Sequence, residues 1–192
     1  MTNVSDEAVT DARLSRCVSN SRCAGADGYE LVRRFEDDTG LRAALYVNSE
    51  GEAVLAFRGT RFFSRRDWIA NLRQAAGFSS AQYESGISLA LELHADLGGN
   101  IRFTGHSLGG GIAAAAAIHA DGNARAFNAA GVHSNTLGDF SRSRGNVTHY
   151  YSSTDVLRAV NALTPVSVPG TQKSLGPAGF HGMRGVCRAM GC

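Results

Sequence analysis

Apolar positions in this chain form short continuous runs in its first third and a helical repeat just beyond it. The runs 41–47 and 53–57 are separated by the polar stretch 48–52, a pattern that predicts a β-hairpin with an Asn, Ser and Gly turn. In 81–97 the apolar side chains recur at helical spacing, and the repeat stops at Gly98. We therefore expect a hairpin followed by an amphipathic helix.

The rest of the chain continues the alternation of strands and helices. Residues 5–19 begin with acidic side chains and predict a helix, whereas 29–35 fits either a strand or a helix. Short strands are expected at 124–127 and 147–151, and the Gly- and Pro-rich tail from residue 165 onward is predicted to be irregular. This order predicts an α/β fold, with a mainly parallel central sheet, an N-terminal hairpin and flanking helices.

Composition restricts the class of protein further. A length of 192 residues fits one domain, 1–192, and the 43% hydrophobic and 19% charged content are those of an ordinary globular protein. A net charge of +2 is too small to indicate a nucleic-acid partner. The first seven residues lack the basic start and apolar core of a secretory signal, and the most apolar run, 112–118, is too short to span a membrane. Export by a non-classical route stays open.

Four cysteines lie near the chain ends, at Cys17, Cys23, Cys187 and Cys192. Their spacing does not match a zinc site, and no metal or organic cofactor is predicted. Disulfides and free thiols fit the sequence equally well, and four cysteines allow three pairings.

The motif that carries chemistry is Gly105-His106-Ser107-Leu108-Gly109, placed between an apolar strand and an Ala-rich helix. Gly-x-Ser-x-Gly in this context is the nucleophile elbow of the α/β-hydrolases, in which glycines allow the strand and helix backbones to approach closely. The turn presents Ser107 as the nucleophile and places the N–H of Leu108 to receive an oxyanion. The alternative is an ordinary Gly-Ser-Gly turn.

Serine needs a base, and in this fold the partners follow it in the order acid, then histidine. No glutamate follows Ser107, so the acid is Asp121, Asp139 or Asp155. Asp155 comes just after a predicted strand, at the sheet edge where such sites form, and His181 is then the one histidine left downstream. The predicted triad is Ser107, His181 and Asp155. A turn-capping role for Asp155 and a surface position for His181 are the alternatives.

Two blocks resemble the class 3 lipases, the family of the fungal triacylglycerol lipases: the segment 104–110, and the segment 56–60 followed by 67–72. The resemblance implies an α/β-hydrolase fold and makes Thr60 the second oxyanion-hole donor beside Leu108. The chain is shorter than the fungal enzymes, and with Phe127-Asn128-Ala129-Ala130-Gly131 it looks like a compact bacterial lipase, phospholipase or esterase domain.

The same resemblance makes 61–76 a lid over the site. Aromatic side chains beside several arginines suit contact with a lipid or membrane surface. The apolar lid residues are Phe62, Phe63, Trp68 and Ile69. The alternative is an ordinary helix that packs Trp68 inward.

The sequence thus predicts a serine hydrolase that cleaves carboxylic esters of lipids or phospholipids through an acyl-enzyme. One alternative is a soluble carboxylesterase acting on small esters. The other is an exported phospholipase toxin domain, for which a cognate inhibitor protein would be a partner.

Overall fold

The computed structural model describes most of the chain, with gaps around the predicted lid and in the C-terminal third. The described residues are 4–59, 68–138, 143, 145–157, 161, 166–179 and 181–192, and side chains within 68–80 are not described.

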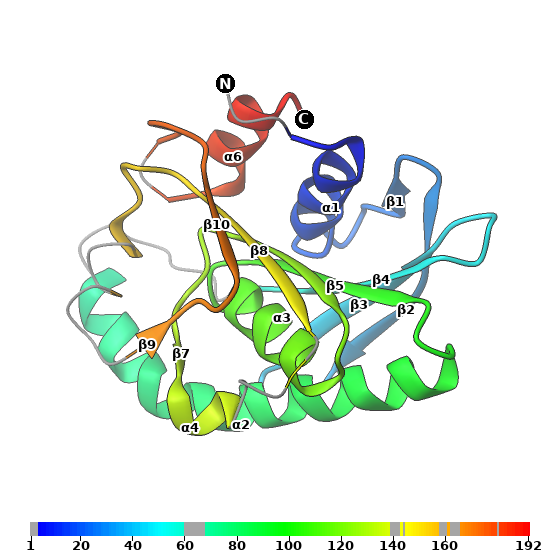
Figure 1. The fold of residues 1–192 in the computed structure, drawn as a ribbon, viewed down its shortest axis with the longest axis horizontal. Helices are drawn as coiled ribbons and strands as arrows, with labels where there is room; N and C mark the ends of the chain where they lie inside the picture. The colour runs from blue at the N-terminus through cyan, green and yellow to red at the C-terminus, as the bar shows by residue number, and fades with distance from the viewer. Residues whose placement is uncertain are drawn as a thin grey trace.

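An eight-stranded mixed sheet forms the centre of the molecule, and its strands follow their order along the chain (Figure 1). The first four pair antiparallel: β1 (Gly25–Ala26), β2 (Tyr29–Glu36), β3 (Arg42–Val47) and β4 (Ala53–Phe57). The rest join in parallel: β5 (Ile101–His106), β6 (Asn123–Phe127), β8 (Asn146–Tyr151) and β10 (Thr171–Ser174). A separate pair consists of β7 (Val132–His133) and β9 (Val166–Ser167).

Helices cover both faces of this sheet (Figure 1). One face carries α2 (Trp68–Asp96), α3 (Leu108–His119) and the short α4 (Ser134–Leu137), and the other carries α1 (Asp6–Cys17) and α6 (Met183–Met190). Because α2 and α3 connect successive parallel strands that advance in one direction across the sheet, right-handed crossovers place both helices on the same face.

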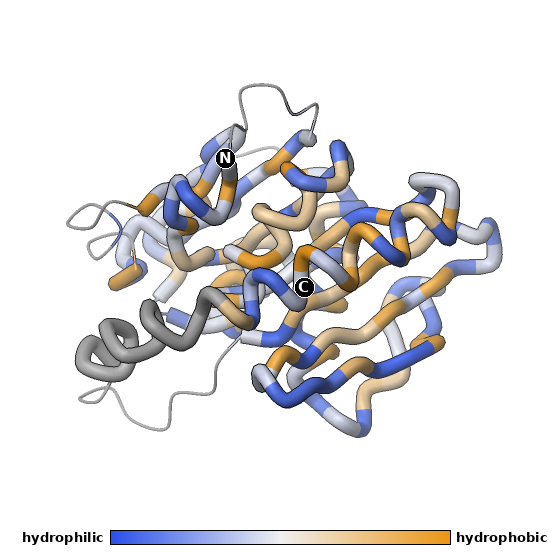
Figure 2. Tube along the Cα trace, turned by 90° about the horizontal axis from the view of Figure 1, so that it is seen from below, coloured by the Kyte–Doolittle hydropathy of each residue, from blue (hydrophilic) through white to orange (hydrophobic). Residues whose placement is uncertain are grey.

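Hydrophobic side chains concentrate between the layers. Helix α3 is buried from Leu108 to Ile118 and packs on the central strands, so its run of alanines lets the helix backbone lie close to the sheet. In Figure 2 hydrophobic colours concentrate in the central elements and hydrophilic colours in the turns. Strand β2, next to the edge strand β1, is mostly exposed. On the opposite face Leu14 of α1 belongs to one buried cluster with Tyr46 and Val54, and a third cluster joins α1 to α6.

A buried ionic cluster fixes α1 to the sheet. Asp11 has no exposed surface, and its carboxylate accepts hydrogen bonds from Arg102 Nε at 2.9 Å and Arg125 Nη1 at 2.8 Å. A disulfide joins Cys17 to Cys23 just after α1, whereas Cys187 and Cys192 are free thiols. The sequence left the state of the four cysteines open, and the structure has one local disulfide, Cys17–Cys23, and two free thiols.

The predicted α/β fold with a mainly parallel sheet and an N-terminal hairpin is confirmed, and 29–35 is resolved as strand β2. The helix expected at 81–97 is present as part of α2, which begins earlier, at Trp68. One expectation was wrong: the tail from residue 165 is not irregular, because it supplies β9, β10 and α6. Strand β10 is a short polar segment at the sheet edge, which produces no apolar run.

Candidate active site

Ser107 occupies a strained turn between β5 and α3. Its φ of 59° lies in the left-handed region that non-glycine residues rarely adopt. Backbone bonds on both sides hold this conformation: Ser107 N–H donates to Phe127 O at 3.1 Å, and Ser107 O accepts from the N–H groups of Gly110 and Ala130. Such strain persists where the surroundings impose it, and it is characteristic of functional sites.

The glycines of the motif are required by close backbone contacts. A Cβ on Gly105 would lie 2.3 Å from Gly109 O, and a Cβ on Gly109 would lie 2.2 Å from Phe57 O. A Cβ on Gly59 would lie 2.6 Å from His106 O. The end of β4 therefore passes directly against the turn, which explains why the two blocks identified in the sequence occur together.

His181 and Asp155 lie together at the carboxyl edge of the sheet. His181 Nδ1 is 2.7 Å from Asp155 Oδ2, and both side chains are largely buried. The second oxygen, Asp155 Oδ1, accepts a hydrogen bond from Leu157 N–H at 2.8 Å. Both carboxylate oxygens therefore have a defined partner, and the imidazole is held with its Nδ1–H toward the acid.

A network of loop bonds ties the segment before His181 to the segment before Asp155. The Ser152 hydroxyl donates to Gly179 O at 3.1 Å and accepts from Ala178 N–H at 3.0 Å, and the Thr154 hydroxyl donates to the same Gly179 O at 2.8 Å. Two polar residues in the Ser-Ser-Thr-Asp turn thus position the loop that delivers the histidine.

His106 lies beside the His181 ring, with the two ring centroids 4.7 Å apart. Burial, together with electrostatic repulsion from His181, lowers the pKa of His106 well below its usual value. His106 therefore stays neutral beside His181.

The remaining predicted residues fall in three groups. Leu108 begins α3, where its N–H has no acceptor within the helix and lies at the positive end of the helix dipole. Asp121 follows the far end of α3, fourteen residues after Ser107, and accepts a hydrogen bond from Ser143. Thr60, Phe62, Phe63 and Asp139 lie outside the described residues, as do the side chains of Trp68 and Ile69, so the lid stays a prediction.

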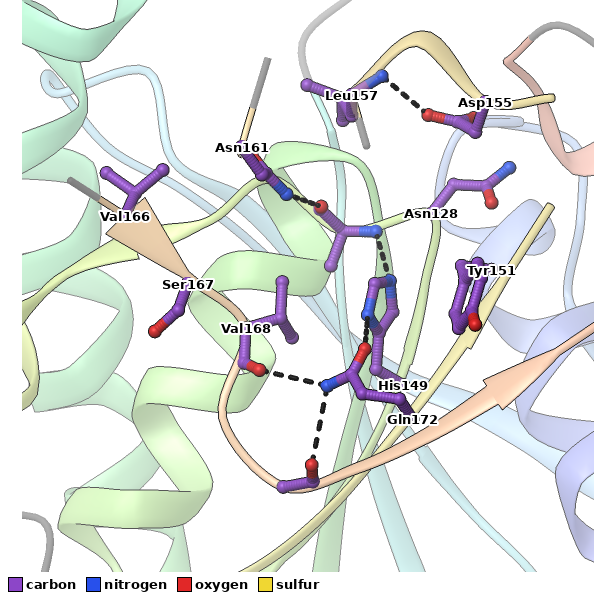
Figure 3. A pocket seen from close by; sticks show the side chains of 12 residues that line it. Asn128, His149, Tyr151, Asp155, Leu157, Asn161, Val166, Ser167, Val168 and Gln172 are labelled. Carbon is purple, nitrogen blue, oxygen red and sulfur yellow. Dashed lines mark hydrogen bonds between the residues drawn. The ribbon is translucent and has the colours of Figure 1, made fainter. Parts of the chain in front are cut away.

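A cavity of about 470 Å³ opens next to Asp155 (Figure 3). Its described lining includes no Lys or Arg, and much of its wall is apolar, from Ala129, Leu157, Val166 and Val168. The polar lining atoms are largely engaged with one another, as the dashed lines in Figure 3 show for His149 and its neighbours. The cavity is thus better suited to an uncharged or aliphatic group than to an anion.

Sequence reasoning missed three polar residues that line this cavity, His149 of β8, Asn161 after Asp155, and Gln172 of β10. His149 and Asn161 accept hydrogen bonds from the loop that follows β6, and Gln172 is hydrogen-bonded to His149. No motif identifies them, because their relation depends on neighbouring strands and not on spacing in the chain.

A family model, described as a Tle-like phospholipase domain, matches residues 24–186. The chain belongs to this family. Among curated proteins, this Tle-like phospholipase domain is similar to the extracellular phospholipase A1 of Serratia liquefaciens, with 43% identity over 110 residues. That alignment covers 57% of this chain and 34% of the relative, so the match spans about a third of the Serratia protein.

Solved structures with a similar fold include fungal lipases, which supports the predicted likeness to class 3 lipases. The triacylglycerol lipase of Penicillium expansum has a TM-score of 0.64 at 17% identity, covering 97% of this chain and 87% of that one. The Rhizomucor miehei lipase has a TM-score of 0.66 at 14% identity, covering 88% and 67%. At these identities the likeness establishes the α/β-hydrolase fold.

Two further observations concern the described residues alone. They contain no group of three or more His, Cys, Asp or Glu side chains arranged to hold a metal ion. Among their helices, none combines the length and apolar character needed to cross a lipid bilayer.

Proposed function

We propose that this protein is a lipid ester hydrolase of the phospholipase A type, with Ser107 as nucleophile, His181 as base and Asp155 as the acid that orients His181. The observation that carries the proposal is the strained Ser107 elbow at the start of α3, in a fold whose carboxyl edge also holds a bonded His181–Asp155 pair.

The chemistry follows from these positions. His181 accepts the Ser107 hydroxyl proton as the oxygen attacks the ester carbonyl, and the Asp155 carboxylate stabilises the imidazolium that results. The Leu108 N–H and, from the resemblance, Thr60 donate to the oxyanion of the tetrahedral intermediate. His181 then protonates the departing alcohol, and water attacking the acyl-enzyme by the reverse steps releases the fatty acid.

Phospholipid is the proposed substrate because the family is described as phospholipase-like and the Serratia relative is a phospholipase A1. The cavity beside Asp155 offers apolar contacts for a hydrocarbon group from Ala129, Leu157, Val166 and Val168. Contact of 61–76 with a membrane surface, and an inhibitor protein as partner, remain expectations from the sequence.

The test compares the wild type, Ser107→Ala and the control Ser19→Ala, which alters an exposed serine after α1. Each is assayed on vesicles of a phospholipid with different acyl chains at its two positions, on a triglyceride emulsion and on a short-chain ester. We expect lysophospholipid and the sn-1 fatty acid from the wild type and the control, and neither from Ser107→Ala. Turnover by Ser107→Ala at the wild-type rate would refute the nucleophile, and activity on the short ester alone would refute the phospholipid substrate.

A further inference from the structure

The loop 128–131 follows β6 and lies against the Ser107 turn. Each of its four backbone N–H groups has an acceptor outside the loop. These acceptors are Tyr150 O for Asn128 at 2.9 Å, His149 Nε2 for Ala129 at 3.0 Å, Ser107 O for Ala130 at 2.9 Å, and Asn161 Oδ1 for Gly131 at 3.1 Å. The loop therefore links the nucleophile to β8, and one of the links is a titratable side chain.

The hydrogen bonds of His149 define its protonation state. Nε2 accepts from the Ala129 N–H, so it carries no proton, and Nδ1–H donates to Gln172 Oε1 at 2.7 Å. Gln172 is itself fixed in this orientation, because its Nε2 donates to Val168 O at 3.0 Å. A protonated His149 would direct a second N–H at the Ala129 N–H, and the bond to the loop would be replaced by repulsion.

The surroundings of His149 favour the neutral ring. The residue is buried, and burial lowers its pKa, while the bond to Gln172 and the carboxylate of Asp155 act in the opposite direction. Among the described residues the groups that face the ring are Ala129 from the loop, Gln172 from β10, Tyr151 of β8 at 5.7 Å between ring centroids, and Asp155.

Movement of Ala129 would change the conformation of Ser107 directly. The next residue, Ala130, donates to Ser107 O, and the Cβ of Ala129 lies only 2.9 Å from where a side chain on Gly110 would begin. Because Ser107 has a strained φ, its conformation is maintained only while these contacts of Ala129 and Ala130 are present.

We propose that neutral His149 is a positioning residue for the reaction, whose Nε2 holds the loop 128–131 against the Ser107 turn. Protonation of Nε2 releases Ala129 and lowers turnover. The inference rests on the proposed hydrolase function, since turnover is one of its readouts.

Two substitutions separate the two ring nitrogens. His149→Gln places a non-titrating acceptor near the position of Nε2, while His149→Asn keeps a donor near Nδ1 for Gln172 and leaves the Ala129 N–H without its acceptor. We expect His149→Asn to lower kcat by roughly tenfold to a hundredfold with little change in KM, as expected for misplaced catalytic groups, and His149→Gln to recover most of kcat. Thermal midpoints of both variants show whether the loss follows from general destabilisation.

Equal kcat for His149→Asn and the wild type would overturn the inference. The inference would also be overturned if both variants lost the same fraction of kcat and showed the same fall in thermal midpoint, because the position of the acceptor would then be irrelevant.

A second readout needs no turnover. In an amide NMR spectrum of the full chain, the Ala129 N–H signal should titrate with a midpoint below the ordinary histidine range, and this titration should be absent in His149→Gln. An Ala129 signal that does not respond to pH in the wild type would refute the bond. If the wild type lacks turnover on every ester, the proposed function fails, and the Ala129 titration alone then decides whether His149 holds the loop.

Discussion

Replacing Asp155 by asparagine tests the proposed triad most sharply, because the structure dictates how the amide must lie. Leu157 N–H donates to Asp155 Oδ1, so an asparagine keeps its oxygen there and directs its NH₂ toward His181 Nδ1. The imidazole must then accept at Nδ1 and carry its proton on Nε2, where it cannot take the Ser107 proton. In serine hydrolases with this arrangement the wrong tautomer costs about 10⁴-fold in kcat.

The assay measures kcat and KM of Asp155→Asn on the ester that the wild type cleaves, with Asp121→Asn as the matched control. The retained Leu157 bond predicts a thermal midpoint close to that of the wild type, so the loss should appear in kcat alone. Asp121 accepts from Ser143 at the far end of α3, so its variant should keep wild-type turnover. If Asp155→Asn remained within about tenfold of the wild type, the orienting role would be refuted.

Three further outcomes are expected. Gly109→Ala should lower the unfolding free energy by about 1–3 kcal/mol and reduce activity, because the new Cβ would lie 2.2 Å from Phe57 O; unchanged urea denaturation would contradict this. Asp11→Ala should cost about 3–5 kcal/mol in a denaturant titration, because it leaves the buried Arg102 without the carboxylate that accepts its Nε–H; a loss below about 1 kcal/mol would contradict the reasoning. The hydrogen bond from Cys192 lowers the pKa of the Cys187 thiol to about 7. A mild thiol oxidant should therefore form a Cys187–Cys192 disulfide at pH 8 but not at pH 5, as measured by mass spectrometry without reduction. Equal rates of disulfide formation at both pH values would contradict this.

The predictions that succeeded rest on local or strongly restricted signals. The hairpin follows from two apolar runs and a turn, and the elbow from a steric requirement that only glycines meet at 105 and 109. Asp155 and His181 were selected because few acids and histidines follow the nucleophile, and the structure brings these two within hydrogen-bond distance. Their catalytic roles stay predictions until the variants are measured.

What the sequence did not reveal depends on contacts between strands. His149 is one of six histidines and has no motif around it, and its role appears only because β6 and β10 pair on either side of β8. The C-terminal elements were missed for a related reason. Strand β10 is a short polar segment at the sheet edge, and α6 contains an internal glycine that weakens its helical signal.

The two faces of the sheet support the site in different ways. On the α3 face, backbone bonds and the loop 128–131 hold Ser107 directly. On the α1 face, Asp11 binds Arg102 of β5 and Arg125 of β6 at once, and these are the two adjacent strands that end in the Ser107 turn and in that loop. A buried carboxylate shared between two neighbouring strands resists their sliding, because any shift in register would separate it from one of the arginines. The distance between Ser107 and the loop 128–131 therefore depends on an ionic cluster on the opposite face of the sheet.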